Sequence, residues 1–155
     1  MIAIADTSPL RYLIMIGEVE LLPKLFERIV IPEAIVSELQ AEGAPLQVRQ
    51  WTEQTPHWLE IAPNPSNIPE VTQTLHSGEQ AAIALALDCH ANLLIIDEKA
   101  ARQIAQRLGI QITGVIGILK IAAKRQLIEP SEVVQKLRQT NFRMSNQLFR
   151  QLLDS

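Results

Sequence analysis

Two short apolar runs in this chain each stop at an aspartate. Residues 2–5 are followed by Asp6, and residues 93–96 are followed by Asp97. Both runs are apolar at every position, which is typical of strands that are buried on both faces of a parallel sheet. Helical stretches lie between the strands, and this alternation predicts helices on both sides of the sheet. We therefore expect residues 1–155 to form a single α/β domain around a central parallel sheet.

The other elements are predicted from helical periodicity, β-branched residues and the positions of glycine and proline. Ser8 is expected to cap the first helix, with Pro9 at its first helical position. Residues 63–69 contain three prolines and are predicted to form a surface loop. The predicted strands are 2–5, 28–31, 58–61, 93–96 and 111–113. The predicted helices are 9–16, 19–26, 32–40, 46–54, 78–90, 99–108, 114–125, 131–139 and 145–153.

Composition excludes some classes of protein. The formal net charge of −3 argues against a strongly basic protein that coats nucleic acid. Cys89 is the single cysteine, so no disulfide can form within the chain, and a cytoplasmic location is the simplest expectation. The N-terminal apolar run is too short for a signal peptide. No uncharged apolar run reaches the ~18 residues that cross a bilayer, so we expect no membrane contact.

Four carboxylates are the candidate functional groups. The carboxyl ends of parallel strands open into one crevice, so Asp6 and Asp97 are expected to face each other there. Glu38 lies beside the inward stripe of its helix, and Glu79 lies in the first turn of an almost wholly apolar helix. Carboxylates that gather without a basic cluster favour a hard divalent cation such as Mg²⁺ or Mn²⁺.

Each of these acids also has an ordinary structural explanation. Asp6, like Asp97, fits an aspartate that ends a buried strand simply to start a turn or cap a helix. Glu38 fits a solvated helix residue. Glu79 fits an acid in the first turn of a helix, where it complements the helix dipole. Ser77 with Gln80 also resembles a capping box. Asp97 fits an N-cap of the following helix.

Several neighbouring residues are candidate auxiliary groups. The hydroxyls of Thr7 and Ser8 are placed to hold Asp6 or a metal-bound water. Arg11 and Arg102 each follow an aspartate by five residues, which suits either a phosphate contact or a surface ion pair. The pair Gly114 and Gly117 is too short a pattern to indicate a function.

Four segments of the chain resemble PIN domains, and they occur in the family's order. They are Asp6 to Leu10 (DTSPL), Ile31 to Leu39 (IPEAIVSEL), Gly78 to Ala86 (GEQAAIALA) and Leu94 to Arg102 (LIIDEKAAR). The resemblance extends over about residues 2–145 and is greatest for the VapC-like prokaryotic branch, which the segment Gly114 to Lys120 also resembles.

The resemblance implies a three-layer α/β/α PIN-like fold and a ribonuclease that depends on Mg²⁺ or Mn²⁺. Asp6 matches the family's first-strand aspartate, Glu38 its early helix glutamate, and Glu79 and Asp97 its later acidic pair. One position departs from the pattern, because Ile95 stands where many PIN domains have threonine or serine. Glu98 takes the place of a second aspartate found in some members.

The leading hypothesis is an endoribonuclease that hydrolyses RNA phosphodiesters and acts as the toxin of a type II toxin–antitoxin pair. Its expected partners are RNA, a cognate antitoxin protein and a second copy of the chain. The stripe of Leu148, Phe149 and Leu152 offers an apolar face for such a homodimer, and packing within the chain explains that stripe equally well.

The alternative is a catalytically weak or inactive PIN-fold module that binds RNA or a protein partner. A phosphotransferase or dehalogenase with Asp6 as nucleophile is less favoured, because Ser8 stands where that chemistry commonly needs a second aspartate. Dinucleotide binding lacks the Gly-x-Gly loop after the first strand.

Overall fold

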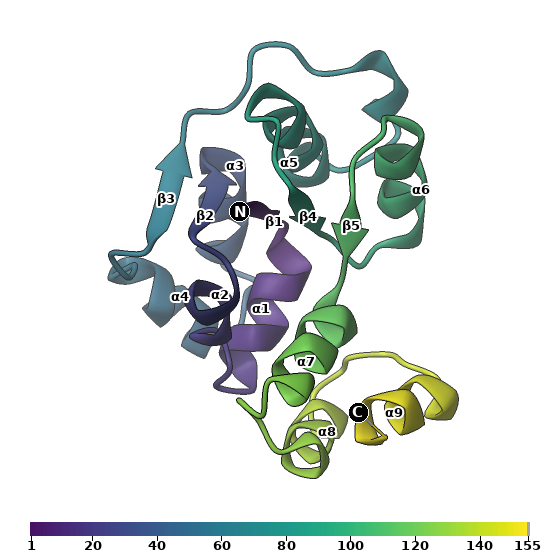
Figure 1. The fold of residues 1–155 in the computed structure, drawn as a ribbon. Coiled ribbons are helices and arrows are strands. Elements are labelled where there is room, and N and C mark those ends of the chain that lie inside the picture. Colours follow the sequence, from purple (N-terminus) through teal and green to yellow (C-terminus); the bar gives the residue numbers. More distant parts are fainter. Residues whose placement is uncertain (155) are drawn as a thin grey trace.

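Strands and helices alternate along most of the chain, as predicted. The structure is a computed structural model that describes residues 1–154, and its elements are labelled in Figure 1. The strands are β1 (Ile2–Ala5), β2 (Arg28–Pro32), β3 (Leu59–Ala62), β4 (Leu93–Ile95) and β5 (Ile112–Thr113). The helices are α1 (Thr7–Met15), α2 (Leu21–Leu25), α3 (Glu33–Leu39), α4 (Leu46–Glu53), a 3₁₀ turn η1 (Glu70–Thr72), α5 (Ser77–Asp88), α6 (Lys99–Arg107), α7 (Val115–Lys124), α8 (Pro130–Arg138) and α9 (Asn146–Leu153).

Within residues 1–154, five strands form one parallel sheet in the order β3-β2-β1-β4-β5. The two strands whose sequences end in aspartate are neighbours, because Ala5 of β1 pairs with Ile95 of β4. The ladder continues one residue further, since Asp6 N–H donates to the carbonyl of Ile95 at 2.9 Å. This register delivers the chain after β1 and after β4 to the same edge of the sheet. The predicted α/β class with a central parallel sheet is confirmed.

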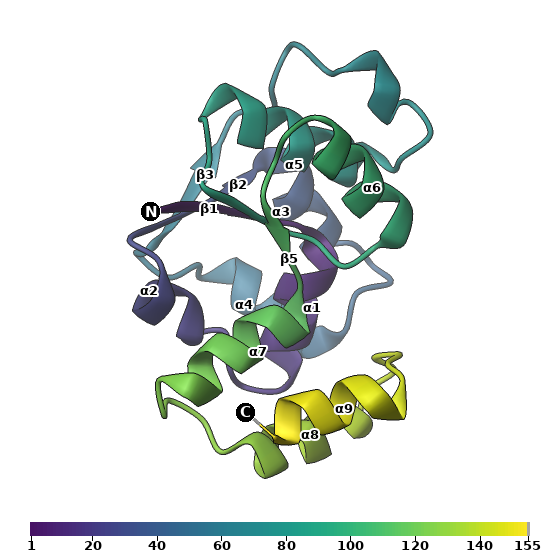
Figure 2. The ribbon, with the colours of Figure 1, turned by 45° about the vertical axis from the view of Figure 1, so that its right-hand side comes forward.

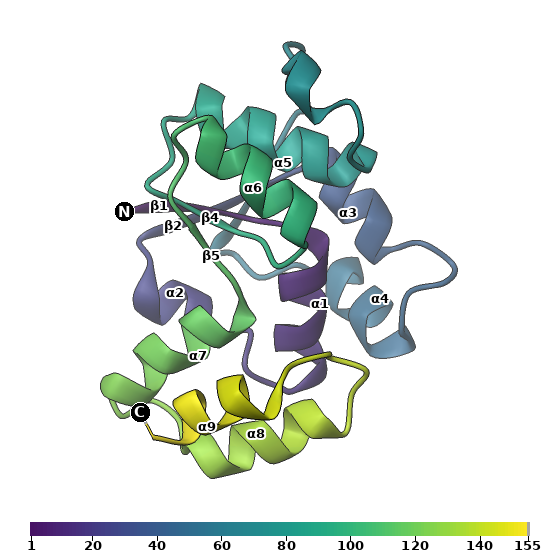
Figure 3. The same ribbon diagram turned by 90° about the vertical axis from the view of Figure 1, so that its right-hand side faces the viewer.

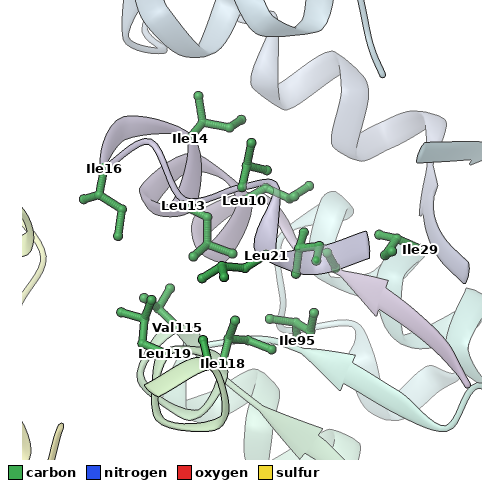
Figure 4. Packing of buried hydrophobic residues seen from close by; sticks show 14 of the residues in the cluster. Leu10, Leu13, Ile14, Ile16, Leu21, Ile29, Ile95, Val115, Ile118 and Leu119 are labelled. Atoms are coloured by element: carbon green, nitrogen blue, oxygen red, sulfur yellow. The ribbon is translucent and has the colours of Figure 1, made fainter. Parts of the chain in front are cut away.

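Apolar side chains fill both faces of the sheet, as expected for strands that are apolar at every position. Ala3 and Ala5 belong to one buried cluster and Ile4 to another, which is the alternation of a pleated strand. Helices α1, α2 and α7 contribute to the first cluster, and α5 and α6 to the second. The two groups of helices lie on opposite sides of the sheet (Figure 2). In Figure 4 Leu13 of α1 points toward Ile118 of α7 across the first cluster. The sheet is therefore held rigidly between two layers of helices.

The first helix begins earlier than the sequence indicated. α1 starts at Thr7, and Asp6 has extended backbone at the position before the helix, so the expectation that Ser8 caps the helix is wrong. Pro9 is the third residue of α1 and not the first, as was expected. It is tolerated there because the first helical N–H groups have no partner within the helix. Thr7 and Ser8 thus lie in the first turn of α1, directly after β1 and Asp6.

The last two helices pack on the rest of the chain. Phe149 and Leu152 of α9 are buried in the first cluster, and the guanidinium of Arg138 lies 4.7 Å from the centre of the Phe149 ring. Leu148 is the exposed member of the predicted stripe, at 41%. Packing within the chain thus accounts for most of that stripe, and the homodimer stays a prediction. Among the described residues, no helix combines the length and apolar character needed to cross a membrane.

Candidate active site

The four predicted carboxylates approach one another at the carboxyl edge of the sheet. Asp6 follows β1, Asp97 follows β4, Glu38 lies in the last turn of α3 and Glu79 in the first turn of α5. Glu79, Glu38 and Asp97 each raise the pKa of Asp6 through their negative charge. The acids do not line a single hollow, however. Asp6, Glu38 and Glu79 line one cleft, and Glu79 and Asp97 line the cleft beside it.

Asp6 is the most deeply buried of the four. It is 3% exposed, and its Oδ1 atom has no hydrogen-bond partner within residues 1–154. Burial is the largest cause that raises its pKa, from 3.8 to about 7, and the backbone N–H of Thr7 opposes this shift. An unpartnered buried carboxylate oxygen is costly unless a cation compensates it. The fold therefore maintains a carboxylate that gains from a positively charged ligand.

Glu38 is fixed by a contact that also involves the start of α1. The hydroxyl of Thr7 donates to Oε1 of Glu38 at 2.7 Å. On the other side lies Gly78, where an added Cβ would overlap the Glu38 carboxylate. The absence of a side chain at Gly78 therefore lets the end of α3 approach the first turn of α5. The solvated-helix interpretation of Glu38 is wrong for this structure.

Glu79 does two things at once. Its Oε1 accepts the backbone N–H of His76 at 3.2 Å, so it stabilises the start of α5 as the dipole argument required. The cap is His76, and the expected pairing of Ser77 with Gln80 is wrong. Burial raises the pKa of Glu79, and the charges of Glu98 and Glu38 act in the same direction. Its structural role in α5 therefore leaves it part of the acidic cluster.

Asp97 is held from the far side of the cluster by the start of α7. The backbone N–H of Val115 donates to its two carboxylate oxygens, at 3.3 and 3.4 Å. Burial raises the pKa of Asp97, whereas this N–H and the charge of Arg102 lower it. At Gly114 an added Cβ would overlap Oδ1 of Asp97. The Gly114–Gly117 pattern, which appeared too short to use, thus marks the place where α7 approaches the acid.

The N-cap explanation of Asp97 is wrong, because Glu98 caps α6. Oε2 of Glu98 accepts the N–H of Ala101 at 2.8 Å. Glu98 is therefore engaged in the helix, although its charge reaches Glu79. Ser8 borders both clefts.

The two arginines do not form the surface ion pairs that were the ordinary expectation. Among residues 1–154, neither Arg11 nor Arg102 belongs to an ion pair. Arg102 Nη1 donates to the carbonyl of Ile96 at 2.8 Å. Arg11 borders the first cleft, and its Nε is buried without a hydrogen-bond partner in the described part of the chain. Both guanidinium groups thus lie near the acids without an ion-pair partner in the described part of the chain.

The two clefts have volumes of about 440 and 430 Å³. Sequence reasoning missed some of the residues that border them. His76 and Ser77 close the first cleft at the start of α5. Tyr12, Phe142 and Arg143 border the second. Helical spacing places Tyr12 near Ser8, but no local pattern connects either to the loop that carries Phe142 and Arg143.

A metal site is incomplete as the side chains are arranged. Within residues 1–154, no three Asp, Glu, His or Cys side chains form a group that could hold a metal ion. Like charges repel, and three of the acids have separate hydrogen-bond partners: Thr7 for Glu38, His76 for Glu79 and Val115 for Asp97. The donors nevertheless fit a hard cation, because all are carboxylate oxygens and one of them, on Asp6, is buried without a partner.

Comparison with known proteins identifies the family. A family model described as a PIN domain matches residues 2–155, so the chain belongs to the PIN-domain family. PIN domains have a nuclease-type fold, are generally nucleases and typically use divalent metal ions.

A solved structure supports the same fold. It is a PilT N-terminus domain protein from the hyperthermophilic archaeon Sulfolobus solfataricus P2, with a TM-score of 0.54 and 18% identity. The match covers 93% of this chain and 100% of that one. At this identity the likeness concerns the fold alone. No curated protein matches the chain.

Proposed function

We propose that this chain is an endoribonuclease that depends on Mg²⁺ or Mn²⁺ and hydrolyses RNA phosphodiesters. The observation that carries the proposal is Asp6, a buried carboxylate with an unpartnered oxygen. Three further acids lie close enough for their charges to raise its pKa. Asp6, Glu38, Glu79 and Asp97 are the proposed metal-holding residues. When bound, such an ion lowers the pKa of a water molecule and neutralises charge on a phosphodiester.

The chain's own groups would position these acids and the substrate. Thr7 orients Glu38, the N–H of His76 orients Glu79, and the N–H of Val115 orients Asp97. Arg11 lines the cleft of Asp6, Glu38 and Glu79, and Arg102 lines a hollow with Asp97. Neither has an ion-pair partner in the described chain. Each is placed to contact a phosphate beside the scissile bond. Ser8 is an auxiliary hydroxyl between the clefts.

In its wider setting, we propose a cytoplasmic toxin of a type II toxin–antitoxin pair that acts as a homodimer. The support is the resemblance of the motifs to the VapC-like branch. An antitoxin would bind as a protein partner and block the acid edge.

The test is cleavage of a single-stranded RNA and of a hairpin RNA in Mg²⁺, in Mn²⁺ and in EDTA. We expect the wild type to cut only with metal and Asp97→Asn to be inactive. Asp88→Asn is the matched control, because Asp88 is exposed at the far end of α5, and it should cut like the wild type. Equal cleavage by Asp97→Asn and the wild type would refute the proposal.

The second candidate is a PIN-fold module that binds RNA or a protein without cutting it. The separation of the acids into two clefts, with no metal-holding group in the described chain, favours it. Ile95, at the position where many PIN domains have a hydroxyl, does so too. The same assay decides, since this candidate binds RNA in Mg²⁺ and in EDTA and releases no shorter product.

A further inference from the structure

The loop between α8 and α9 runs beside α1 (Figure 3), and its residues Phe142 and Arg143 border a hollow that Glu79 and Asp97 also line. Two contacts hold it there. The hydroxyl of Tyr12 donates to Oδ1 of Asn141 at 2.7 Å, and the rings of Tyr12 and Phe142 meet edge to face with centres 4.9 Å apart. A loop that is attached at consecutive residues has a defined position relative to Asp97, although it is distant in sequence.

Phe142 and Arg143 stand between two hollows that open beside Asp97. One hollow, of about 430 Å³, is shared with Glu79 and Asp97. The other, of about 390 Å³, is shared with Asp97 and Arg102. Both volumes fall within the range of sites that hold small ligands, roughly 300–1,000 Å³. An aromatic ring and a guanidinium group thus border both hollows, at the acid that ends β4.

The charge of Arg143 has no partner in the described chain. Arg143 is exposed and forms no ion pair among residues 1–154. It lies beside carboxylates in a protein of net charge −3, so a polyanion that approaches the acids meets a cation here. Phe142 differs from Phe149 of α9, which is buried and covered by Arg138. Phe142 is partly buried and lines both hollows.

We infer that Phe142 and Arg143 form a nucleotide-binding subsite, in which the ring stacks one unpaired base and the guanidinium contacts the adjoining phosphate. The inference rests on the proposed nuclease function and specifies its substrate as single-stranded RNA. Bases in a duplex are already stacked on each other, so only an unpaired base can present its face to an aromatic ring. The subsite lies on the Asp97 side of the scissile phosphate.

The test combines removal of the ring with removal of the base. The substrate is a short single-stranded RNA with one cleavage site, together with versions that lack the base on either side of the cut. The variants are Phe142→Leu, Phe142→Tyr and Arg143→Gln. Tyr12→Phe tests the loop attachment, and Arg125→Gln, exposed at the other end of α7, is the matched charge control. Thermal unfolding checks that each variant is folded.

We expect Phe142→Leu to lower kcat/KM by roughly 5- to 100-fold, the range for loss of one stacked base. Loss of one particular base from the substrate should lower the wild-type kcat/KM by a similar factor. The same loss should lower the kcat/KM of Phe142→Leu no further. Phe142→Tyr, which keeps an aromatic ring, should cleave the intact substrate like the wild type. Arg143→Gln should raise KM and reduce the salt dependence of binding by about one phosphate contact. Arg125→Gln should match the wild type.

Additive effects of ring and base would overturn the inference, as would full activity of Phe142→Leu on every substrate. If Phe142 and Arg143 formed an interface for a protein partner instead, Phe142→Leu would keep full activity on every substrate. If the wild type cleaves nothing, the nuclease proposal fails, and anisotropy of a labelled oligonucleotide with Asp6→Asn still tests the subsite. Equal affinities of Asp6→Asn with and without Phe142→Leu would then refute it.

Discussion

The ends of β1 and β4 have the same sequence pattern, an apolar strand and then an aspartate, yet the two aspartates have different surroundings. Asp97 is partly buried, accepts the N–H of Val115 and lies in the field of Arg102. Asp6 is 3% exposed, and its Oδ1 has no hydrogen-bond partner within residues 1–154. Burial raises the pKa of both, and that of Asp6 reaches about 7.

The two aspartates show that where a carboxylate lies and how easily it carries a charge are determined separately. The strand-end pattern locates a carboxylate at the edge of the sheet, but its partners decide how easily it carries a charge. The protein itself stabilises the charge of Asp97 through an N–H and a guanidinium. Asp6 is more deeply buried, and three further acids add to the rise in its pKa, which the Thr7 N–H only partly opposes. Its charge therefore gains more from an added cation than that of Asp97 does. We therefore regard Asp6 as the residue that links metal binding to the stability of the fold.

The largest expected effect is on catalysis. Asp6→Asn and Asp97→Asn should each lower the cleavage rate by at least roughly 100-fold, the upper range for loss of a residue that merely supports a metal ligand. If both aspartates serve one site, the double variant should be hardly slower than either single variant. Single-turnover cleavage in Mn²⁺ measures this. Losses that multiply would mean that the two strand ends act separately.

The metal-free protein should become less stable as the pH rises. The pKa of Asp6 is raised from 3.8 to about 7 on folding, so the folded state binds more protons than the unfolded state between these values. Stability is then lost as the pH rises from about 4 to about 7, by up to about 4 kcal/mol at ~1.4 kcal/mol per pKa unit. Urea unfolding in EDTA at several pH values measures this loss.

Asp6→Asn should remove most of that pH dependence, because Asn does not titrate. Asp97→Asn should remove less, since an N–H and Arg102 already oppose the rise in the pKa of Asp97. The opposite ranking of the two variants would contradict the comparison of the strand ends.

Gly114→Ala should disturb Asp97 and leave Asp6 in place, because a Cβ there would overlap Oδ1 of Asp97. We expect a destabilisation of about 1–3 kcal/mol, as for other overpacked sites, together with slower cleavage. Gly43→Ala is the matched control, since nothing lies within 4 Å of its added Cβ. Chemical denaturation compares the two, and equal stabilities would mean that α7 does not hold Asp97.

The smallest expected effect separates Glu98 from the acids that face the metal. Glu98→Ala removes the cap of α6 and should cost about 0.5–2 kcal/mol. Cleavage should fall far less than in Asp6→Asn, because the Glu98 carboxylate is engaged with the N–H of Ala101. A loss of activity as large as that of Asp6→Asn would make Glu98 a metal ligand.

The sheet and the approach of the acids were predictable from the sequence, because both depend on strong local patterns. Strands that are apolar throughout indicate a parallel sheet, and its carboxyl edge then collects Asp6 and Asp97. Glu38 was less certain, because it lies only beside the inward stripe of its helix. Glu79 was less certain too, because its helix is apolar almost all round and has no single inward face.

The remaining features depend on contacts between distant segments. Nothing local shows that Gly114 lies against Asp97, because that contact requires α7 to pack beside β4. The position of Phe142 depends on its contact with Tyr12 and on the packing of the last helices. The cap of α5 is His76 and not Ser77, because the helix begins one residue earlier than the sequence pattern indicated. A shift of one residue in the helix start changes which residue is the cap.

The most direct test of the account is the melting temperature of wild type and Asp6→Asn at pH 8, each in EDTA and in millimolar Mn²⁺. In EDTA the variant should melt higher, because it lacks a buried, repelled charge. In Mn²⁺ the order should reverse, since an ion that binds the folded wild type stabilises it and the variant has lost a central ligand. The same order of melting temperatures in both conditions would contradict the claim that Asp6 is held ready for a metal ion.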